Sequence, residues 1–462
     1  MPAGRLRTGS VAAVAVEEAA GRPSAGTATA SSLPDAASLS RSALASVGLV
    51  VLVVAGLAVA LGAAAGPSFL IYGDSRLPGV PAWLVGPLAG VAPAPGPTTF
   101  SLLVLAMMAS YVAVLAGAEA LRPRVALGVV LLLHAALLVA PPILSGDLFS
   151  YLVYARLDLV HGLDPYRHAA DVAPGDPLYP WVGIKHIASP YGPLFTLGTW
   201  VLVPLGPAAG VWALKALAVG AALACAALTW SCARRLGRAP LGPTLFVALN
   251  PVALVYGVGG GHNDLFMAVL ILGGVRLALG GRERAAAAAV VGAASVKATG
   301  GLVLPFLLLG ARRRARALGA ALAATATMSV VALAGFGLES MLGYLEVVLR
   351  QGGFVSLYSV WPLLVKASGL GTGVPTLLRV LLLAAFAAAT LAAGWRAWHG
   401  EDWVSCAGWA VLALLVTTTW ILPWYVVLLT PLAALGSSAR LRIATHAFTV
   451  LVLITRLPVL LG

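Results

Sequence analysis

The sequence predicts an all-α protein that crosses a membrane many times. Of its 462 residues, 60% are hydrophobic and only 10% are charged, and the mean hydropathy is +0.96. A soluble protein of this length would carry roughly 25% charged residues. Apolar stretches long enough to cross a bilayer as helices recur along the chain. The composition therefore excludes an ordinary soluble enzyme and favours a polytopic bundle of helices surrounded by membrane lipids.

The first residues predict a tail followed by a membrane anchor. Residues 1–43 are rich in Ala, Ser and Gly without apolar periodicity, which predicts a disordered cytoplasmic tail. The apolar run 43–65 is too long for a signal-peptide core and lacks a convincing cleavage site, so we expect it to stay as an anchor. Residues 44–462 then form one transmembrane domain. Its cysteines show no disulfide or zinc spacing, which predicts core positions for Cys225, Cys232 and Cys406.

Basic clusters between the apolar runs predict the topology, because Lys and Arg gather on the cytoplasmic side of membrane proteins. The clusters lie at 122–124, 234–238, 282–284, 312–316, 396 and 440–442. Placing them all inside gives about thirteen crossings, with the N-terminus in the cytoplasm and the C-terminus outside. The predicted spans are 44–65, 99–121, 125–144, 208–232, 241–258, 262–280, 285–298, 301–311, 317–337, 374–395, 403–418, 423–436 and 442–461. The net charge of +13 thus reflects topology, and no nucleic-acid-binding motif accompanies it.

Residues 285–311 are a special case, because basic residues flank both ends of the segment. A single span would put one of those clusters on the wrong side of the membrane. Two short helices that meet outside at Lys297 satisfy the rule, and Gly300 and Gly301 follow directly.

The longest predicted outer loop, 145–207, begins with a helix that has one polar side. At 100° per residue its polar residues form a single stripe: Asp147, Ser150, Tyr151, Tyr154, Asp158 and His161. The helix is too polar to span, so we expect it to lie on the outer membrane surface, with Arg156 reaching water or lipid phosphates from its apolar side. The apolar part of 189–206 is too short to cross, which predicts an interfacial or re-entrant piece.

Further polar residues are predicted at the same outer level. The Gly-rich break 259–261 presents His262, Asn263 and Asp264, and the segment 417–425 ends in a polar-aromatic turn with Trp424. Cations are costly inside a membrane unless they are paired or functional. A set of them at one depth could hold an anionic headgroup such as a lipid phosphate. The candidates near the outer ends of spans are Lys215, Lys297, Arg379 and Arg456.

Each of these features also has a plain structural interpretation. Asp147 follows Ser-Gly at a helix start and could be an N-terminal cap. The stripe could be the solvated face of a surface helix, and residues 262–264 an ordinary turn between spans. The outer cations could snorkel, and Trp424 could belong to an aromatic belt. A metal site is a minor possibility, because its candidate ligands match no known spacing: His161, Asp164, His168 and His186.

Several segments together resemble one family. They are SGDLFSYLVYARL (145–157), GLDPY (162–166), SPYGPLF (189–195), NPVALVYGVGGGHNDL (250–265) and SVKATGGLVLPF (295–306). This combination is similar to the actinobacterial polyprenol-phosphate-mannose-dependent α-1,6-mannosyltransferases, which belong to the GT-C class of multi-span glycosyltransferases, and it covers roughly residues 100–430. The resemblance implies a GT-C-like bundle that transfers mannose from a polyprenyl-phosphate-mannose donor to a lipomannan- or lipoarabinomannan-type glycolipid acceptor. The transfer would take place on the outer face of the plasma membrane.

Many GT-C enzymes carry Asp-x-Asp or Glu-x-Asp in the first large outer loop, whereas Asp147 has no second acid two residues away. This departure leaves dependence on a divalent cation open and makes Asp147 the candidate general base. An inverting transfer needs such a carboxylate to take the acceptor proton, and cations to stabilise the leaving phosphate. Lys297, with Arg379 or Arg456, would supply the cations. The other candidate substrate-binding residues are Tyr151, Tyr154, Asp164, Tyr191, His262, Asn263, Asp264 and Trp424.

Two other classes of protein compete with this interpretation. A transporter or lipid flippase would favour charges at the membrane midplane and paired broken helices in two repeated halves. Here the ionisable residues concentrate at the outer interface, with His134 as the main exception. A non-catalytic scaffold would explain the apolar spans, but it gives no reason for an ordered Asp/Tyr/His stripe.

Overall fold

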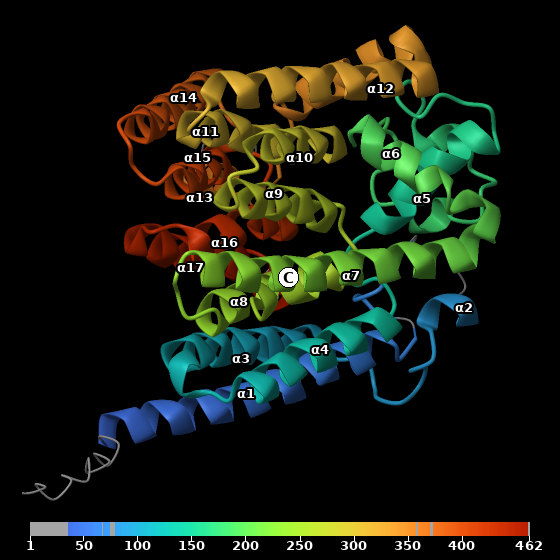
Figure 1. The fold of residues 1–462 in the computed structure, drawn as a ribbon. Helices are drawn as coiled ribbons and strands as arrows, with labels where there is room; N and C mark the ends of the chain where they lie inside the picture. The colour runs from blue at the N-terminus through green and yellow to red at the C-terminus, as the bar shows by residue number, and fades with distance from the viewer. Residues whose placement is uncertain (1–35, 67, 74–78, 357–358, 370–372, 461–462) are drawn as a thin grey trace, which may run out of the picture.

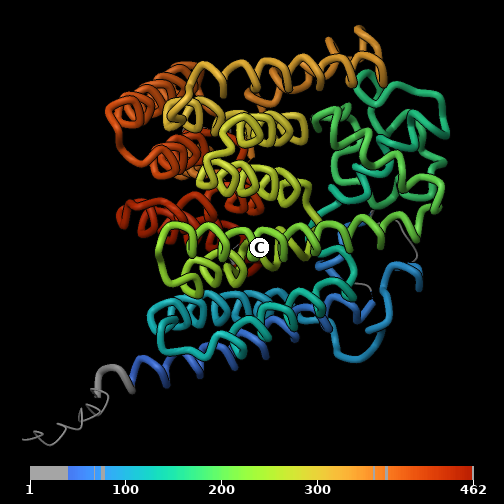
Figure 2. The backbone as a smooth tube through the Cα atoms, viewed as in Figure 1, coloured from blue at the N-terminus to red at the C-terminus, as the bar shows by residue number. Residues whose placement is uncertain are grey.

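The computed structural model describes residues 36–66, 68–73, 79–356, 359–369 and 373–460. Within these ranges every regular element is a helix, and the sole extended pairing is one bridge between Ala169 and Ala188. The long helices lie side by side in one bundle (Figure 1). The tube in Figure 2 shows the segment between α4 and α7 folded as a compact irregular layer over one end of that bundle. The predicted all-α fold is confirmed.

The N-terminal half contains the elements α1 to α9. The bounds are α1 Ala36–Ala63, α2 Ala82–Val85, α3 Pro97–Ala116, α4 Pro123–Val139, α5 Asp147–Leu159, α6 Pro193–Trp200, α7 Gly206–Arg235, α8 Leu241–Ala248 and α9 Asp264–Leu279, with a π-helical turn at Ala253–Val258. Helix α1 begins inside the predicted tail, so residues 36–43 are helical, while 1–35 lie outside the described residues. Proline is the first residue of α3, α4 and α6, where its missing N–H costs no helical hydrogen bond.

The C-terminal half contains α10 to α17. The bounds are α10 Glu283–Val296, α11 Leu304–Gly310, α12 Arg314–Gln351, α13 Val360–Ala367, α14 Thr376–Trp398, α15 Trp403–Thr417, α16 Val426–Leu435 and α17 Ala439–Ile454. The predicted break at Lys297 is confirmed, because that residue is extended (φ −153°, ψ 127°) between α10 and the 3₁₀ turn Ala298–Val303. Helix α12 is continuous except at Gly337, where φ is +80° and the chain bends.

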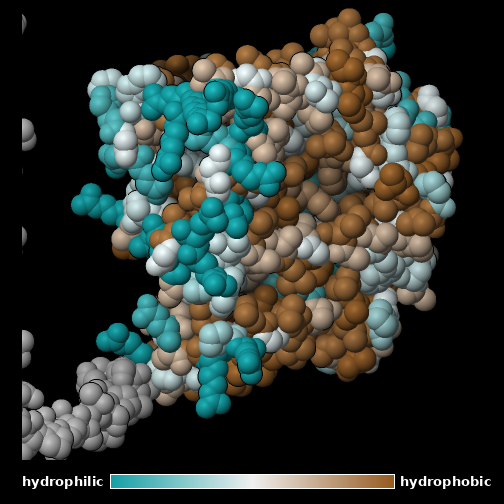
Figure 3. Space-filling view, viewed as in Figure 1, coloured by the Kyte–Doolittle hydropathy of each residue, from teal (hydrophilic) through white to brown (hydrophobic). Residues whose placement is uncertain are grey.

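The helices support membrane insertion, at a coarser level than the sequence prediction. Among the described residues, five helical stretches are long and apolar enough to cross a membrane: Ser40–Ala63, Pro97–Ala116, Pro193–Arg235, Arg314–Gln351 and Thr376–Trp398. Shorter apolar helices lie at Pro123–Val139, Ala298–Gly310, Trp403–Thr417 and Pro423–Leu435. Hydrophilic residues gather at the end of the bundle where α1 and α12 begin, and apolar residues cover much of the rest of the visible face (Figures 1 and 3). The protein is therefore a helical membrane protein.

Two predictions about single side chains can be judged from their contacts. Cys225, Cys232 and Cys406 are buried free thiols, as predicted. The prediction for Arg156 was wrong, because its Nε lies 2.8 Å from Oδ2 of the buried Asp176. An unpaired buried carboxylate is strongly destabilising, so Arg156 pairs with Asp176 instead of extending into solvent. The pair connects the last turns of α5 to the loop that follows the helix.

Candidate active site

Asp147 is the first residue of α5, and the local backbone fixes its position. The side chain of Ser145 accepts a hydrogen bond from the Asp147 N–H (3.1 Å), and the carboxylate of Asp147 makes no capping bond. The interpretation of Asp147 as a helix cap is thereby excluded. At Gly146 an added Cβ would lie 2.4 Å from the Gly183 nitrogen, so only glycine lets the two loop segments pack together here. The Asp147 side chain itself is 21% exposed.

The middle of the polar stripe of α5 faces the protein rather than solvent. Ser150, Tyr151 and Tyr154 are 4%, 2% and 4% exposed, which excludes the solvated-face interpretation for these three residues. At the end of the stripe Asp158 is half-buried and His161 is exposed. The Tyr154 hydroxyl donates to the Ile187 carbonyl (2.7 Å), and the ring of Tyr191 packs edge-on against that of Tyr151, with 4.6 Å between centroids. Burial, and then the charge of Asp147, raise the pKa of all three tyrosines far above the ordinary value. These phenols are therefore neutral at physiological pH and cannot serve as bases.

His262 and Asn263 are fully buried behind Asp147. The His262 Nδ1 atom lies 3.4 Å from Oδ2 of Asp147, and the Tyr151 hydroxyl donates to Oδ1 of Asn263 (3.2 Å) and accepts from its backbone N–H (3.2 Å). The His262 ring stacks on Trp424, with 3.6 Å between centroids and 16° between planes. Both side chains were predicted to contact substrate. The side chains of His262 and Asn263 are not part of either cavity wall described below, and their contacts are with Asp147 and Tyr151.

Lys297 and Asp264 form a second pair at the site. The Lys297 Nζ donates to both carboxylate oxygens of Asp264, at 2.9 and 2.8 Å, and lies 4.5 Å from the centre of the Tyr425 ring. The Lys297 side chain is 15% exposed and that of Asp264 is 2% exposed. An added Cβ at Gly192 would lie 2.2 Å from the Ser295 carbonyl oxygen, so glycine is required where this turn docks beside Lys297. The bidentate contact neutralises most of the lysine's charge.

Two cavities meet at Asp147. The first, about 330 Å³, also contains Lys297, Asp264, Tyr154 and Tyr191 in its wall. The second, about 800 Å³, is lined by Arg456, Tyr256, Ser145 and a larger number of apolar and aromatic side chains. Asp147 belongs to both walls, as do Trp420 and Trp424. The carboxylate is therefore accessible from two sides.

The second cavity contains polar groups with hydrogen-bonding capacity. Arg456 donates to the carbonyl of Ile421 and to the hydroxyl of Ser356 (3.5 Å). The Tyr256 hydroxyl is buried and has no hydrogen-bond partner within the described ranges. Sequence reasoning missed Tyr256, although a lone tyrosine within the apolar run 250–258 was the available signal.

The remaining predicted site residues lie elsewhere. Asp164 accepts from the Tyr166 N–H (2.8 Å) in a turn of its own, and Arg379 donates to the carbonyls of Val374 (3.2 Å) and Gly353 (3.1 Å). Neither side chain is part of the two cavity walls. Lys215 is completely buried in α7, and its Nζ donates to the carbonyls of Ala140 and Pro141. All three side chains form hydrogen bonds with backbone groups.

The structure offers little for a metal ion. No group of three or more His, Cys, Asp or Glu side chains arranged to hold a metal occurs in the part of the chain that is described. Asp147 and Asp264 face one cavity, but both oxygens of Asp264 already accept from Lys297.

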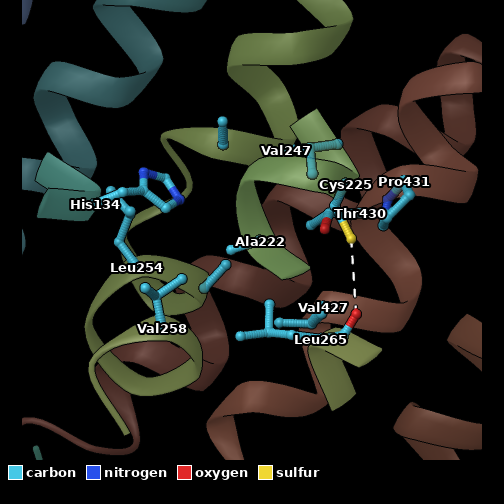
Figure 4. A pocket seen from close by; sticks show the side chains of 12 residues that line it. His134, Ala222, Cys225, Val247, Leu254, Val258, Leu265, Val427, Thr430 and Pro431 are labelled. Atoms are coloured by element: carbon cyan, nitrogen blue, oxygen red, sulfur yellow. Dashed lines mark hydrogen bonds between the residues drawn. The ribbon is translucent and has the colours of Figure 1, made fainter. Parts of the chain in front are cut away.

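The region around His134 bears on the transporter interpretation. His134 is buried, its Nδ1 lies 2.8 Å from the Val130 carbonyl oxygen, and it borders a cavity of about 20 Å³. Figure 4 shows apolar side chains around that cavity, with Cys225 directed toward the Leu265 carbonyl. Such a space suits about one water molecule. The cavity is too small for a transported substrate beside His134, the residue that the transporter interpretation would use.

Comparison with known proteins decides the family. The family described as "Alpha-(1->6)-mannopyranosyltransferase, N-terminal domain" matches residues 46–313, more than half of the chain. The chain belongs to this family.

Curated relatives carry the same name. The chain is 32% identical over 343 residues to alpha-(1->6)-mannopyranosyltransferase A of Mycobacterium tuberculosis, a match that covers 68% of this chain and 65% of the relative. It is 34% identical over 182 residues to the protein of that name from Corynebacterium glutamicum, covering 37% of this chain and 36% of the relative. The matches thus span less than two thirds of these relatives' own length. No solved structure matches the chain.

Proposed function

We propose that this protein is a membrane mannosyltransferase that moves mannose from polyprenyl-phosphate-mannose to a lipid-linked mannan acceptor through an α-1,6 linkage. The observation that carries the proposal is that Asp147 lies on the wall common to two cavities. A base in this position can reach an acceptor hydroxyl in one cavity while the donor's sugar enters from the other. The family and its named relatives support mannose and the linkage.

The donor fits the second cavity. Its wall combines apolar and aromatic side chains, such as Phe69 and Phe100, with the guanidinium of Arg456 and the hydroxyl of Tyr256. A prenyl chain needs the apolar surface, and a phosphate needs cationic and hydroxyl donors. Lys297 is the weaker phosphate ligand, because Asp264 already compensates its charge. Arg456 lies on the wall of the proposed donor cavity, whereas Lys297 lies on the wall of the other cavity, so Arg456 takes the place of Lys297 as the main cation in the proposed mechanism.

The acceptor fits the first cavity. Asp147 takes the proton of the acceptor hydroxyl as that oxygen attacks C1 of mannose, while the bond between C1 and the phosphate oxygen breaks. The leaving polyprenyl phosphate keeps the electron pair, and Arg456 stabilises its charge. His262 holds the carboxylate from behind at 3.4 Å. Tyr154 and Tyr191 line the acceptor side.

The proposed location is the outer face of the plasma membrane, with about thirteen crossings and a cytoplasmic N-terminus. The basic clusters of the sequence support it, and hydrophilic residues gather at the end of the bundle far from α5 (Figures 1 and 3). A lipid-linked donor suits this side, where nucleotide sugars are absent.

Two incubations test the function. Membranes containing the protein are incubated with labelled polyprenyl-phosphate-mannose, and separately with labelled GDP-mannose plus an inhibitor of lipid-linked mannose synthesis. We expect labelled glycolipid from the first incubation alone. Asp147→Asn keeps the size of the side chain and should reduce transfer by roughly 10²–10⁴ at a normal protein level. Transfer from GDP-mannose under inhibition would refute the lipid donor, and near-normal transfer by the variant would refute the base.

A further inference from the structure

A third hollow lies beside the site, between the outer part of α12 and the loop 166–188. Its volume is about 730 Å³. Ile187 and Phe354 line both this groove and the cavity that contains Asp147 and Lys297. No residue of the described ranges lines both this groove and the cavity that contains Arg456. The groove therefore adjoins the acceptor side of Asp147 and not the side lined by Arg456.

The charged side chains of the groove come in balanced pairs. Arg167 of the loop contacts Glu339 of α12, and Glu346 lies 2.6 Å from Arg350 one helical turn further along. Two carboxylates and two guanidinium groups leave no net charge, and His186 is the other basic side chain on the wall, so the described wall of the groove has no cluster of cations that would select an anion. It offers both hydrogen-bond acceptors and donors instead, which neighbouring hydroxyl groups of a neutral sugar can use.

These ion pairs contribute little to the fold. The side chains of Arg350 and Glu346 are 73% and 61% exposed, and those of Arg167 and Glu339 are 54% and 80% exposed. Exposed pairs of this kind stabilise a protein by about 0–1 kcal/mol. Stability of the fold therefore does not explain why two ion pairs lie along one groove, whereas ligand binding would.

The same helix segment carries an exposed apolar row beside the groove, and Leu342 belongs to both. Leu338, Leu345 and Leu349 are spaced at helical intervals and are 64%, 52% and 70% exposed. They follow the bend at Gly337, so this part of α12 has both an apolar row and a charged groove face. An amphipathic helix of this type suits a membrane surface. A ligand of the groove would then lie at the surface of the bilayer in which its lipid anchor is embedded.

We infer that this groove binds the neutral oligosaccharide chain of the acceptor, several sugars back from the hydroxyl that receives mannose. The inference rests on the proposed function, and it assigns the protein an elongating role, because an acceptor of one sugar would leave the groove empty. Glu346 and Arg350 hold the chain by hydrogen bonds, and Phe354 marks the passage to Asp147.

The test measures binding and transfer separately. Purified full-length protein is titrated with a free α-1,6-linked mannohexaose, and binding is followed by saturation-transfer NMR. Transfer from polyprenyl-phosphate-mannose is then measured to an alkyl monomannoside and to an alkyl hexamannoside. The groove variant carries Glu346→Gln with Arg350→Gln, which keeps the net charge. The matched control carries Arg396→Gln with Glu401→Gln, an exposed pair of similar geometry on α14 and the turn after it.

We expect the groove variant to weaken hexaose binding and to raise KM for the hexamannoside about tenfold, since hydrogen bonds to charged groups are lost. KM for the monomannoside and all values of the control should stay unchanged. No hexaose binding to the unmodified protein, or equal effects on both acceptors, would overturn the groove. A third possible result is that hexaose binds to the unmodified protein but not to the Glu346→Gln, Arg350→Gln variant, and that mannose is transferred to no acceptor. That result would support the groove as an oligosaccharide site and refute the proposed enzyme activity.

Discussion

The ion pair between Lys297 and Asp264 allows a test of whether Lys297 stabilises the fold or binds the donor phosphate. Replacing Lys297 by Met removes both hydrogen bonds and leaves the Asp264 carboxylate, 2% exposed, without its cation. Breaking a buried pair in this way costs about 3–5 kcal/mol. With an unfolding entropy of about 2.1 cal/mol/K per residue, or about 1 kcal/mol/K for the whole chain, the melting temperature should fall by roughly 3–5 °C.

A second variant distinguishes the loss of stability caused by an unpaired Asp264 carboxylate from a role of Lys297 in the reaction. Lys297→Met combined with Asp264→Leu removes both charges, and we expect it to recover most of the lost stability. Thermal unfolding in detergent and transfer to the acceptor are measured on both variants. If Lys297→Met alone melts at the normal temperature and fails only at limiting donor, Lys297 is a phosphate ligand, and its role as the structural counter-ion of Asp264 is refuted.

Three further outcomes are expected. Under the proposed function His262 is buried and positions the base, so His262→Ala should lower kcat about 10- to 100-fold with little change in KM. His262→Gln, which keeps a hydrogen-bond donor, should recover part of the lost kcat, and a change confined to KM would contradict this role. Cysteine in place of the exposed His161 should react with an impermeant thiol reagent from outside intact cells, whereas Arg313→Cys should not, and labelling of the latter would overturn the topology. Burial, reinforced by a nearby acid, raises the pKa of Asp158, so the stability that this shift provides is present at low pH and is lost as pH rises through the folded pKa. Asp158→Asn should therefore raise the melting temperature at neutral pH and leave it unchanged at about pH 3, measured by thermal unfolding, and an equal effect at both values would contradict the shift.

Sequence reasoning located the break at Lys297 and the polar stripe of α5, because both depend on local pattern. Charge at both ends of 285–311 demanded a turn, and the helical spacing from Asp147 aligned its polar residues. Burial of that stripe was not predictable, since its partners His262 and Asn263 are more than a hundred residues away. The helical spacing of polar residues does not show whether that side of the helix faces solvent or packs against the rest of the protein.

Hydropathy also gives the depth of a residue in the membrane but not its position around the bundle. Arg379 and Arg456 were predicted at one level near the outer surface. The structure places Arg456 on the wall of a cavity with Asp147, and Arg379 on the carbonyls of Val374 and Gly353. Which helix neighbours which is decided by packing between distant segments, and a single sequence does not show it.

The shared position of Asp147 has a consequence for the order of events. Two cavities open onto one carboxylate, so neither substrate has to leave before the other arrives. Under the proposed function, donor and acceptor are bound at the same time, and mannose is transferred directly between them without a covalent mannosyl-enzyme intermediate. Initial rates at varied concentrations of both substrates should then give intersecting double-reciprocal lines. The same arrangement protects the activated sugar from water, because an acceptor that fills its cavity leaves the base no other hydroxyl to deprotonate.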